Sequence, residues 1–185
     1  AGVGFLTLDL DVSVDAWWIA YRVLALEPDV VGMSVVCWNA RTVYEAARLI
    51  KAARPSTTIV FGGPEVGPIA EDVLAAQPAA DAVVRGEGEA TFAALLDAVL
   101  RGRDLTRVEG VTARRDGRIH SAVDRPLIAD LDSIPSPYLT GILQPVDGAT
   151  YLETYRGCPH RCSYCFEGKG YGRLRYFSED RVSAE

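Results

Sequence analysis

Between residues 4 and 101, hydrophobic residues follow two rhythms that alternate along the chain. Compact runs rich in β-branched residues, such as 30–36, are typical of strands buried on both faces. Between these runs, apolar residues recur every three or four positions, which is the spacing of one helix face. The pattern predicts strands over 5–12, 30–36, 58–61 and 82–84, and helices over 17–24, 43–50, 66–73 and 92–99. This alternation indicates an α/β fold with a doubly wound parallel sheet.

The pattern changes after residue 102. Residues 110–120 have the pattern of a β-hairpin around an Asp-Gly turn. Residues 124–145 hold four prolines and few periodic apolar positions, so we expect an ordered connector there. A strand over 150–155, then a loop and the start of a helix, complete the prediction. The expected domains are 1–103, a hairpin and connector over 104–148, and the beginning of a second domain over 149–185.

The charge of the chain limits its partners. Its 185 residues include 25 acidic and 19 basic ones, a formal net charge of −6. Because nucleic-acid phosphates bind basic surfaces, we expect no nucleic-acid partner. The longest nearly unbroken apolar run, 30–38, is far below the roughly 18 residues that a membrane-spanning helix requires, so we expect no membrane association. With no recognisable secretion leader, the expected location is cytoplasmic.

Three of the four cysteines lie within eight residues, in the run Cys158-Pro-His-Arg-Cys162-Ser-Tyr-Cys165. Such near neighbours are poor disulfide partners, and in a chain without a leader they indicate a metal site. Three thiolates on a four-iron cluster leave one iron open to an exogenous ligand. The alternative is a zinc site in which His160 is the fourth ligand. Three buried cysteines without a metal are disfavoured, because the residues between them are not core residues.

Small and polar residues follow three of the expected strands. Because the carboxyl ends of parallel strands meet at one edge of a sheet, we expect these residues to gather at a single rim. Glycine at such a rim lets backbone approach a ligand closely. The three groups are Ser34 and Val35; Gly62, Gly63, Pro64 and Glu65; and Arg85, Gly86, Glu87, Gly88 and Glu89. A tight turn without a ligand would explain either glycine loop alone, whereas three converging strand ends favour a cofactor pocket.

Trp38 and Asn39 come shortly after the first of these strand ends. Either side chain could face the pocket. Asn39 equally suits the N-cap position of the helix that follows, and Cys37 is expected to be a small buried residue.

These motifs resemble those of the cobalamin-binding radical S-adenosylmethionine (radical SAM) enzymes. The cysteines, spaced by three and two residues with an aromatic residue before the last, are similar to the radical SAM motif. Residues 31–34 and the two glycine loops resemble loops of a Rossmann-like cobalamin domain, and 130–135 resembles the connector between domains. The resemblance covers nearly the whole chain. It implies a cobalamin domain followed by the first part of a radical SAM (β/α) barrel.

The resemblance also implies three cofactors and assigns residues to each. Cys158, Cys162 and Cys165 would hold a [4Fe–4S] cluster whose open iron binds SAM, and the segment at Tyr164 and Phe166 would lie against the adenine. The cobalamin site would be lined by Ser34, Val35, Gly62, Gly63, Pro64, Glu65, Gly86 and Glu87. Reductive cleavage of SAM would give a radical that takes a hydrogen atom from substrate. The implied activity is methylation of an unactivated carbon of a small molecule, with an electron donor of flavodoxin or ferredoxin type.

Several alternatives stay open beside this activity. Some members of the family cyclise or rearrange substrates instead, and a non-catalytic corrinoid-binding or zinc-stabilised module is the alternative from another class. A methylthiotransferase is disfavoured, because it needs three further cysteines and only Cys37 is available. The chain has no Asp-x-His-x-x-Gly motif to supply the cobalt ligand of classical cobalamin domains. It also begins at the expected second strand of that domain and ends twenty residues after Cys165, so we expect this chain alone to be inactive.

Overall fold

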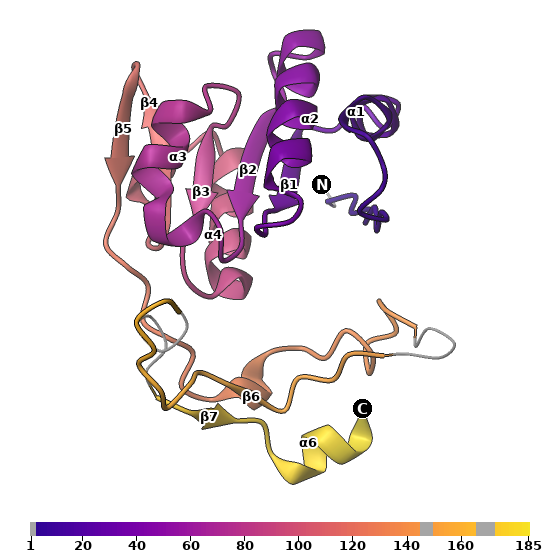
Figure 1. Ribbon diagram of the computed structural model, residues 1–185, viewed down its shortest axis with the longest axis vertical. Coiled ribbons are helices and arrows are strands. Elements are labelled where there is room, and N and C mark those ends of the chain that lie inside the picture. Colours follow the sequence, from indigo (N-terminus) through magenta and orange to yellow (C-terminus); the bar gives the residue numbers. More distant parts are fainter. Residues whose placement is uncertain (1–2, 145–149, 166–172) are drawn as a thin grey trace. The chain divides into compact units, whose positions relative to one another are not determined.

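Two compact units make up the chain, Ala1–Arg125 and Pro126–Glu185 (Figure 1). The computed structural model describes residues 3–144, 150–165 and 173–185. The first unit is built around a β-sheet with helices, and the described residues of the second form turns, two short strands and a terminal helix.

A five-stranded sheet forms the centre of the first unit, in the order β1-β2-β3-β4-β5. Three strands are parallel, namely β1 (Val30–Ser34), β2 (Thr58–Gly62) and β3 (Ala82–Val84). The predicted hairpin is formed by β4 (Val111–Arg115) and β5 (Arg118–Ser121). It continues the same sheet, because β4 pairs with β3 in the antiparallel direction. The predicted α/β fold is confirmed, with this antiparallel pair added at one side.

Helices cover both faces of the sheet. The helical elements are α1 (Ala16–Leu24), α2 (Ala40–Ala53), the 3-10 turn η1 (Gly67–Ile69), α3 (Ala70–Ala76), α4 (Gly88–Leu100) and the 3-10 turn η2 (Leu105–Arg107). Residues of α1, α2 and α3 share one buried cluster with the sheet, whereas α4 belongs to a second cluster. In the described part of the chain, no helix has the length and apolar character that crossing a bilayer requires.

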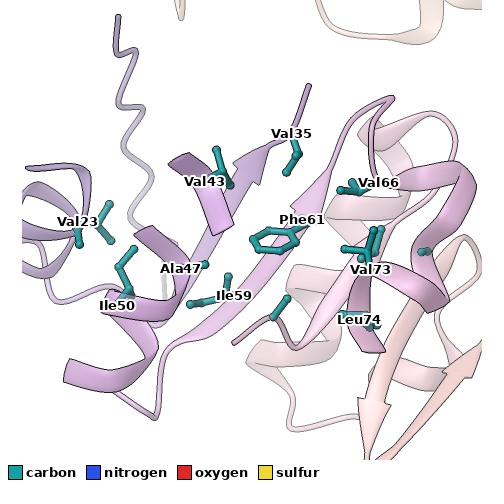
Figure 2. Packing of buried hydrophobic residues seen from close by; sticks show 14 residues of the cluster. Val23, Val35, Val43, Ala47, Ile50, Ile59, Phe61, Val66, Val73 and Leu74 are labelled. Atoms are coloured by element: carbon teal, nitrogen blue, oxygen red, sulfur yellow. The ribbon is translucent and has the colours of Figure 1, made fainter. Parts of the chain in front are cut away.

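Successive side chains of β2 belong to different clusters, because they point to opposite faces of the sheet. Ile59 and Phe61 belong to the cluster with α1, α2 and α3 (Figure 2), whereas Val60 belongs to the cluster with α4. All three side chains are buried. Because successive side chains of a strand point to opposite faces, a strand covered on both sides needs apolar residues at every position. This requirement explains the unbroken apolar run in the sequence.

The spacing of apolar residues predicts well which residues are buried in α2 and less well which are buried in α1. In α2 the predicted apolar positions are buried, namely Val43, Ala46, Ala47 and Ile50. In α1 the buried residues are Ala20 and Val23. Trp17 and Tyr21, predicted on the apolar face, are exposed and stack on one another with ring centroids 5.7 Å apart. The short helix therefore buries its small residues and leaves its aromatic rings outside.

The strand predicted over 5–12 is wrong. Residues 3–11 have extended or irregular backbone and belong to no sheet. Phe5, Leu6 and Val12 are exposed, and Leu8 alone of this segment packs against the first cluster. Alternating apolar residues are only a local signal, and a strand also needs a neighbour to accept and donate its backbone hydrogen bonds.

The second unit contains the short elements η3 (Leu131–Ser133), β6 (Tyr155–Arg156), β7 (Arg175–Tyr176) and α6 (Glu179–Ala184). The strands β6 and β7 pair in the antiparallel direction over two residues each. The strand predicted over 150–155 is therefore reduced to its last residue and Arg156, because β7 offers a partner only there.

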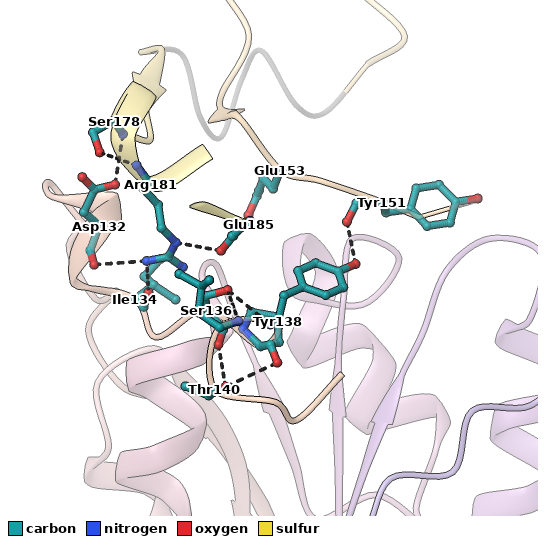
Figure 3. Close-up of polar contacts among 12 residues, drawn as sticks. Asp132, Ile134, Ser136, Tyr138, Thr140, Tyr151, Glu153, Ser178, Arg181 and Glu185 are labelled. Atoms are coloured by element: carbon teal, nitrogen blue, oxygen red, sulfur yellow. Dashed lines mark hydrogen bonds and ion pairs between the residues drawn. The ribbon is translucent and has the colours of Figure 1, made fainter. Parts of the chain in front are cut away.

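A polar contact network joins the connector of this unit to α6 (Figure 3). The Arg181 guanidinium donates to the Ile134 carbonyl at 2.9 Å and forms an ion pair with Glu185 at 2.7 Å. The Asp132 carboxylate accepts the Ser178 backbone N–H at 3.0 Å, and the Ser178 hydroxyl caps α6. These bonds hold the connector against the helix that follows the cysteine segment.

Candidate functional site

The carboxyl ends of β1 and β2 lie in register at one edge of the sheet. Ser34 pairs with Gly62, and the Val35 N–H extends the pairing by donating to the Gly62 carbonyl at 2.7 Å. One strand further, a Cβ on Gly62 would lie 4.0 Å from Cβ of Val84, the last residue of β3. The structure thus brings together the strand ends that the sequence predicted to converge.

Gly63 occupies a position that requires glycine. Its φ is +110°, and a Cβ built there would lie 2.5 Å from the Val35 carbonyl oxygen. The turn is closed by Gly67, whose N–H donates to the Gly63 carbonyl at 3.0 Å, while the Glu65 N–H donates to the Val35 carbonyl at 3.4 Å. The backbone of the β1 and β2 ends therefore packs directly together, with no side chain between them.

The loop after β3 presents backbone in a different way. Gly86 has a φ of +69°, and a Cβ on Gly86 or Gly88 would meet no atom within 4 Å. Helix α4 begins at Gly88, and its N-cap residue Glu87 makes no side-chain capping bond. A helix start with open space above two glycines leaves amide groups accessible to polar groups of a ligand. A Cβ on Gly67 would lie 3.9 Å from the Gly86 nitrogen, so the two glycine loops are neighbours.

Asn39 holds the loop that follows β1. Its Nδ2 donates to the Ser34 carbonyl at 3.0 Å, and its Oδ1 accepts the Val36 N–H at 2.9 Å. Asn39 occupies the N-cap position of α2, but its side chain makes no capping bond to the helix. Trp38, next to it, is 72% exposed. The buried position expected for Cys37 is wrong, because this thiol is exposed; the tied loop turns residues 37 and 38 outward.

Tyr44 is a residue of this edge that the sequence did not identify. Its ring lies 5.5 Å from that of Phe61, measured between centroids. Burial, together with the negative charge of the nearby Glu65, raises the pKa of the Tyr44 phenol above its ordinary value. Like any tyrosine phenol at neutral pH, it is protonated and can donate a hydrogen bond. Its position among the apolar residues of α2 gave no signal of this role.

The predicted metal ligands lie on the segment after β6. Cys158 and Cys165 are half-buried and Cys162 is exposed, and all three thiols are free. The Cys165 N–H donates to the Cys162 carbonyl at 3.2 Å, so residues 162–165 form a turn. Nevertheless, no three Cys, His, Asp or Glu side chains in the described residues are grouped as they would be around a metal ion. The structure places the three thiols on one segment without bringing them together.

The residues predicted to contact adenine lie beside the last cysteine. Tyr164 is 90% exposed, and Phe166 lies outside the described residues. On the other side of the cysteines, Arg156 of β6 is bound through two nitrogens to Glu153, at 3.0 and 2.9 Å. Gly157 then has a φ of +98°, which turns the chain from β6 into the cysteine segment.

The two donor sets fit their expected cofactors to different degrees. We call Gly62 and Gly63, at the end of β2, the glycine cradle. At the sheet edge, this cradle and the open space above Gly86 and Gly88 suit a wide ligand carrying many amide groups, such as cobalamin. Three free thiols on one short segment have the donor chemistry of an iron–sulfur cluster. Their geometry lacks the convergence that a cluster imposes.

A separate open groove of about 740 Å³ lies along α4, and none of the predicted site residues lines it. Its arginines are paired with acids: Arg103 with Asp97, and Arg115 with Asp104. Arg125 and Glu109 are 3.7 Å apart. Since these charges are compensated within the protein, the groove does not form an obvious anion site.

Comparisons with known proteins agree on the first unit. A family model described as a B12 binding domain matches residues 2–96. An uncharacterised methyltransferase of Pyrococcus horikoshii is 35% identical, covering 90% of this chain and 38% of the relative. The cobalamin-dependent radical SAM methyltransferase TokK of Streptomyces tokunonensis is 34% identical, covering 86% of this chain and 25% of TokK. An anaerobic magnesium-protoporphyrin IX monomethyl ester cyclase of Synechocystis is 34% identical, covering 71% of this chain and 27% of the cyclase.

A solved structure shows the same fold. The cobalamin-dependent S-adenosylmethionine radical enzyme OxsB, with aqua-cobalamin and S-adenosylmethionine bound, superposes with a TM-score of 0.73 at 23% identity. The match covers 92% of this chain and 24% of OxsB. This chain thus spans between 24% and 38% of the length of the proteins named above.

Proposed function

Because this chain belongs to the B12-binding domain family, we propose that the strand-end edge of its sheet binds cobalamin within a radical SAM enzyme. The glycine cradle is the observation that carries the proposal. At Gly63 any side chain would strike the Val35 carbonyl, and above Gly86 the backbone is open to solvent. An edge of this kind admits a broad ligand close to the backbone without steric cost.

The residues of this edge have distinct tasks toward cobalamin. Amide groups near the start of α4 face polar groups of the ligand, and the exposed Trp38 ring offers a flat apolar surface for a corrin ring. The protonated Tyr44 phenol is available as a donor beside Glu65. The proposed contacts are Ser34, Val35, Gly62, Gly63, Pro64, Glu65, Gly86 and Glu87.

We propose that Cys158, Cys162 and Cys165 hold a [4Fe–4S] cluster, with Tyr164 and Phe166 near the adenine of SAM. The support for this assignment is the cysteine spacing together with three free thiols. Since metal sites often organise their ligands only on binding, the separated thiols are compatible with a cluster that gathers them. The fourth iron position is then left for SAM.

When bound, the cluster with SAM supplies a carbon-centred radical and cobalamin supplies a methyl group. The protein binds and orients these cofactors and excludes water from them. The proposed reaction is methylation of an unactivated carbon of a small molecule, with electrons delivered by a flavodoxin- or ferredoxin-type protein. The methyltransferase relatives support this choice.

Cyclisation of a small molecule is the second candidate reaction. The cyclase relative, 34% identical to this chain, favours it. The reaction product distinguishes the two reactions, because methylation adds one carbon from SAM to the substrate and cyclisation adds none. Feeding SAM labelled in its methyl group therefore gives labelled product only in the first case.

Cobalamin binding is tested with hydroxocobalamin and the purified chain. After desalting, we expect cobalt and corrin absorbance to remain with the protein. Gly63→Ala introduces a clash with the Val35 carbonyl and should lower retained cobalt by about tenfold. Gly117→Ala is the matched control, since Gly117 also has a positive φ, +75°, but lies in the β4–β5 turn with no atom near its Cβ position. Loss of cobalt from both variants alike, or none bound by the wild type, would reject the site.

The cluster and its SAM chemistry are tested on the protein as it occurs naturally. Anaerobic reconstitution with iron and sulfide, followed by SAM and dithionite, should give 5′-deoxyadenosine. Replacing the three cysteines by alanine should abolish both the brown colour and this product, while Cys37→Ala should abolish neither. An intact cluster that yields no 5′-deoxyadenosine would reject the radical reaction, and tight zinc binding without iron would reject the cluster.

A further inference from the structure

Arg85 stands at the start of the glycine loop (residues 85–89), but its side chain contacts the β-hairpin and the chain beyond it. Nη1 donates to the Thr112 hydroxyl at 2.6 Å, and Nη2 donates to the Ala122 carbonyl at 2.5 Å. Nη2 also forms an ion pair with Asp124 at 2.8 Å. The Arg85 side chain is only 15% exposed, whereas its partner Asp124 is 87% exposed, so the ion pair lies at the surface and the guanidinium itself is largely buried. One guanidinium thus joins the glycine loop to β4 and to residues 122–125, which we call the exit segment.

The exit segment is fastened at two further points. The Arg125 Nε donates to the hydroxyl of Thr91, a fully buried residue of α4, at 3.1 Å. The Val123 carbonyl accepts the Gly110 N–H at 2.8 Å, and the Gly110 carbonyl in turn accepts the Arg85 N–H at 2.8 Å. The glycine loop is therefore flanked by attachments of the exit segment, at Arg85 before it and at Thr91 after it.

The packing around these bonds leaves little room for independent movement. A Cβ on Gly110 would lie 2.9 Å from the Thr91 hydroxyl oxygen, so the backbone before β4 presses against the first turns of α4. The exit segment also holds the last residues of the first unit, since the second unit begins at Pro126. The bonds of Arg85 and Arg125 thus connect the glycine loop and α4 directly to the residues that lead out of this unit.

We propose that Arg85 is a positioning residue that couples cobalamin binding at the glycine loop to ordering of the exit segment. The proposal rests on the cobalamin function proposed above. A ligand that orders the loop restricts Arg85 and Thr91, and their bonds pass that restriction to residues 122–125. Arginine suits this task because its planar fork bonds several acceptors at once, which the single ammonium of lysine does not reproduce.

The test compares Arg85→Met and Arg85→Lys with Arg114→Met. Arg114 is a matched control: it is also partly buried, donates to a backbone carbonyl (that of Leu74), and has a buried Nε without a hydrogen-bond partner among the described residues, as does Arg85. Its contacts lie on α3, away from the glycine loop. Hydrogen exchange is measured in the full chain with and without hydroxocobalamin. The cobalamin affinity and the urea unfolding of each variant are measured as well.

In the wild type and in Arg114→Met, hydroxocobalamin should slow amide exchange across residues 120–125 by about tenfold. In Arg85→Met the slowing should fall below about twofold and the cobalamin Kd should rise about tenfold. Arg85→Lys should restore part of the slowing. Equal loss of slowing in Arg85→Met and Arg114→Met would show a general effect of stability and overturn the proposal.

Two failures are distinguishable. If the wild type does not bind hydroxocobalamin, the proposed cobalamin function is wrong, and the coupling proposal, which depends on it, is rejected as well. If the wild type binds hydroxocobalamin while exchange across residues 120–125 is unchanged, the function stands and the coupling is overturned. Unaltered exchange of this segment in unliganded Arg85→Met would also overturn it, because the bonds to Ala122 and Asp124 would then not hold the segment.

Discussion

In the first unit a sheet buries apolar residues on both of its faces, whereas the described part of the second unit fully buries one apolar side chain, Leu131, and one polar residue, Ser136. Charged and polar bonds take the place of a core there, with Arg181 and Glu185 at their centre (Figure 3). The side chains of this pair are only 13% and 8% exposed. The first unit is thus held mainly by the hydrophobic effect, and the second by a small network of directional contacts.

This difference bears on how each unit would bind the cofactor proposed for it. A sheet with its own core presents the glycine cradle in a formed state, because strand pairing already fixes Ser34, Gly62 and Gly63. In the described part of the second unit, few buried apolar residues are available to fix the cysteine segment beside the polar network. We therefore expect cobalamin to enter a preformed edge, and an iron–sulfur cluster to add much of the order of the second unit.

Removing a core side chain should give the largest effect and confine it to the first unit. Phe61 is fully buried, and Phe61→Ala is expected to lower the free energy of unfolding by about 4 kcal/mol. Urea unfolding followed by tryptophan fluorescence measures this unit alone, since all three tryptophans, Trp17, Trp18 and Trp38, lie in it. Phe5→Ala, at an exposed phenylalanine of the same unit, should cost less than about 0.5 kcal/mol. Equal costs for the two variants would contradict a core-held first unit.

The matching change in the second unit is Arg181→Met. It removes the cationic partner of the shielded Glu185, whose bond from Ser136 remains, and frees the Ile134 carbonyl, so we expect a local loss of about 3 kcal/mol. Hydrogen exchange across residues 131–136 and 179–185 should accelerate, with tryptophan-detected unfolding unchanged. Arg118→Met, at an exposed arginine of β5, is the control and should alter neither measurement. A shift of the tryptophan signal in Arg181→Met would show that the units do not unfold separately.

The same contrast explains how much of the fold the sequence could predict. Compact apolar runs located β1, β2 and β3, and the 3.6-residue spacing located α2. The residues of β3, most residues of β2 and one face of α2 are buried, whereas the edge strand β1, expected to be buried on both faces, is half-buried or exposed throughout because it has a neighbour on one side only. The pattern over 5–12 has no pairing partner and gave a false strand. In the second unit, β6 depends on β7 some twenty residues later, a pairing that no local pattern encodes.

For the site, the sequence located the backbone positions and named Asn39 and Arg85, but it did not predict the contacts that these polar side chains make. The family indicated by the motifs is confirmed, and the strand ends converge as expected. The roles of Asn39, Tyr44 and Arg85 emerge only from contacts in three dimensions. Arg85, for example, bonds to residues 27 and 37 positions away. The cysteine ligand set stays a prediction.

A smaller effect is expected from the polar network inside the first unit. The Lys51 ammonium donates to both Asp81 oxygens, at 2.9 and 2.7 Å, and to the Thr57 carbonyl at 2.7 Å. Lys51→Met removes these bonds beside an intact core, and the pair is more exposed than the Arg181 pair, so we expect a loss of about 2 kcal/mol by tryptophan fluorescence. Arg48→Met, which breaks the exposed pair with Glu45 on the same helix, should cost less than about 0.5 kcal/mol. If Lys51→Met costs as much as Phe61→Ala, the first unit depends on its polar network as much as on its core.

The smallest effect should come from acid, and it should separate the units. Hydrogen bonds from Ser178 hold the pKa of Asp132 below its ordinary value, and bonds from Ser136 and Arg181 hold the pKa of Glu185 below its own. Because both carboxyls bind protons less tightly when folded, their contribution is present above about pH 4 and is lost as the pH falls through their lower folded values. NMR signals of the Ser178 and Arg181 amides should therefore shift below pH 4. The pKa values of Asp97 and Asp104 in the first unit are lowered too, but its buried apolar core should keep tryptophan fluorescence constant. Asp132→Asn should remove the part of this shift that arises at Ser178, and simultaneous loss of both signals would contradict the difference between the units.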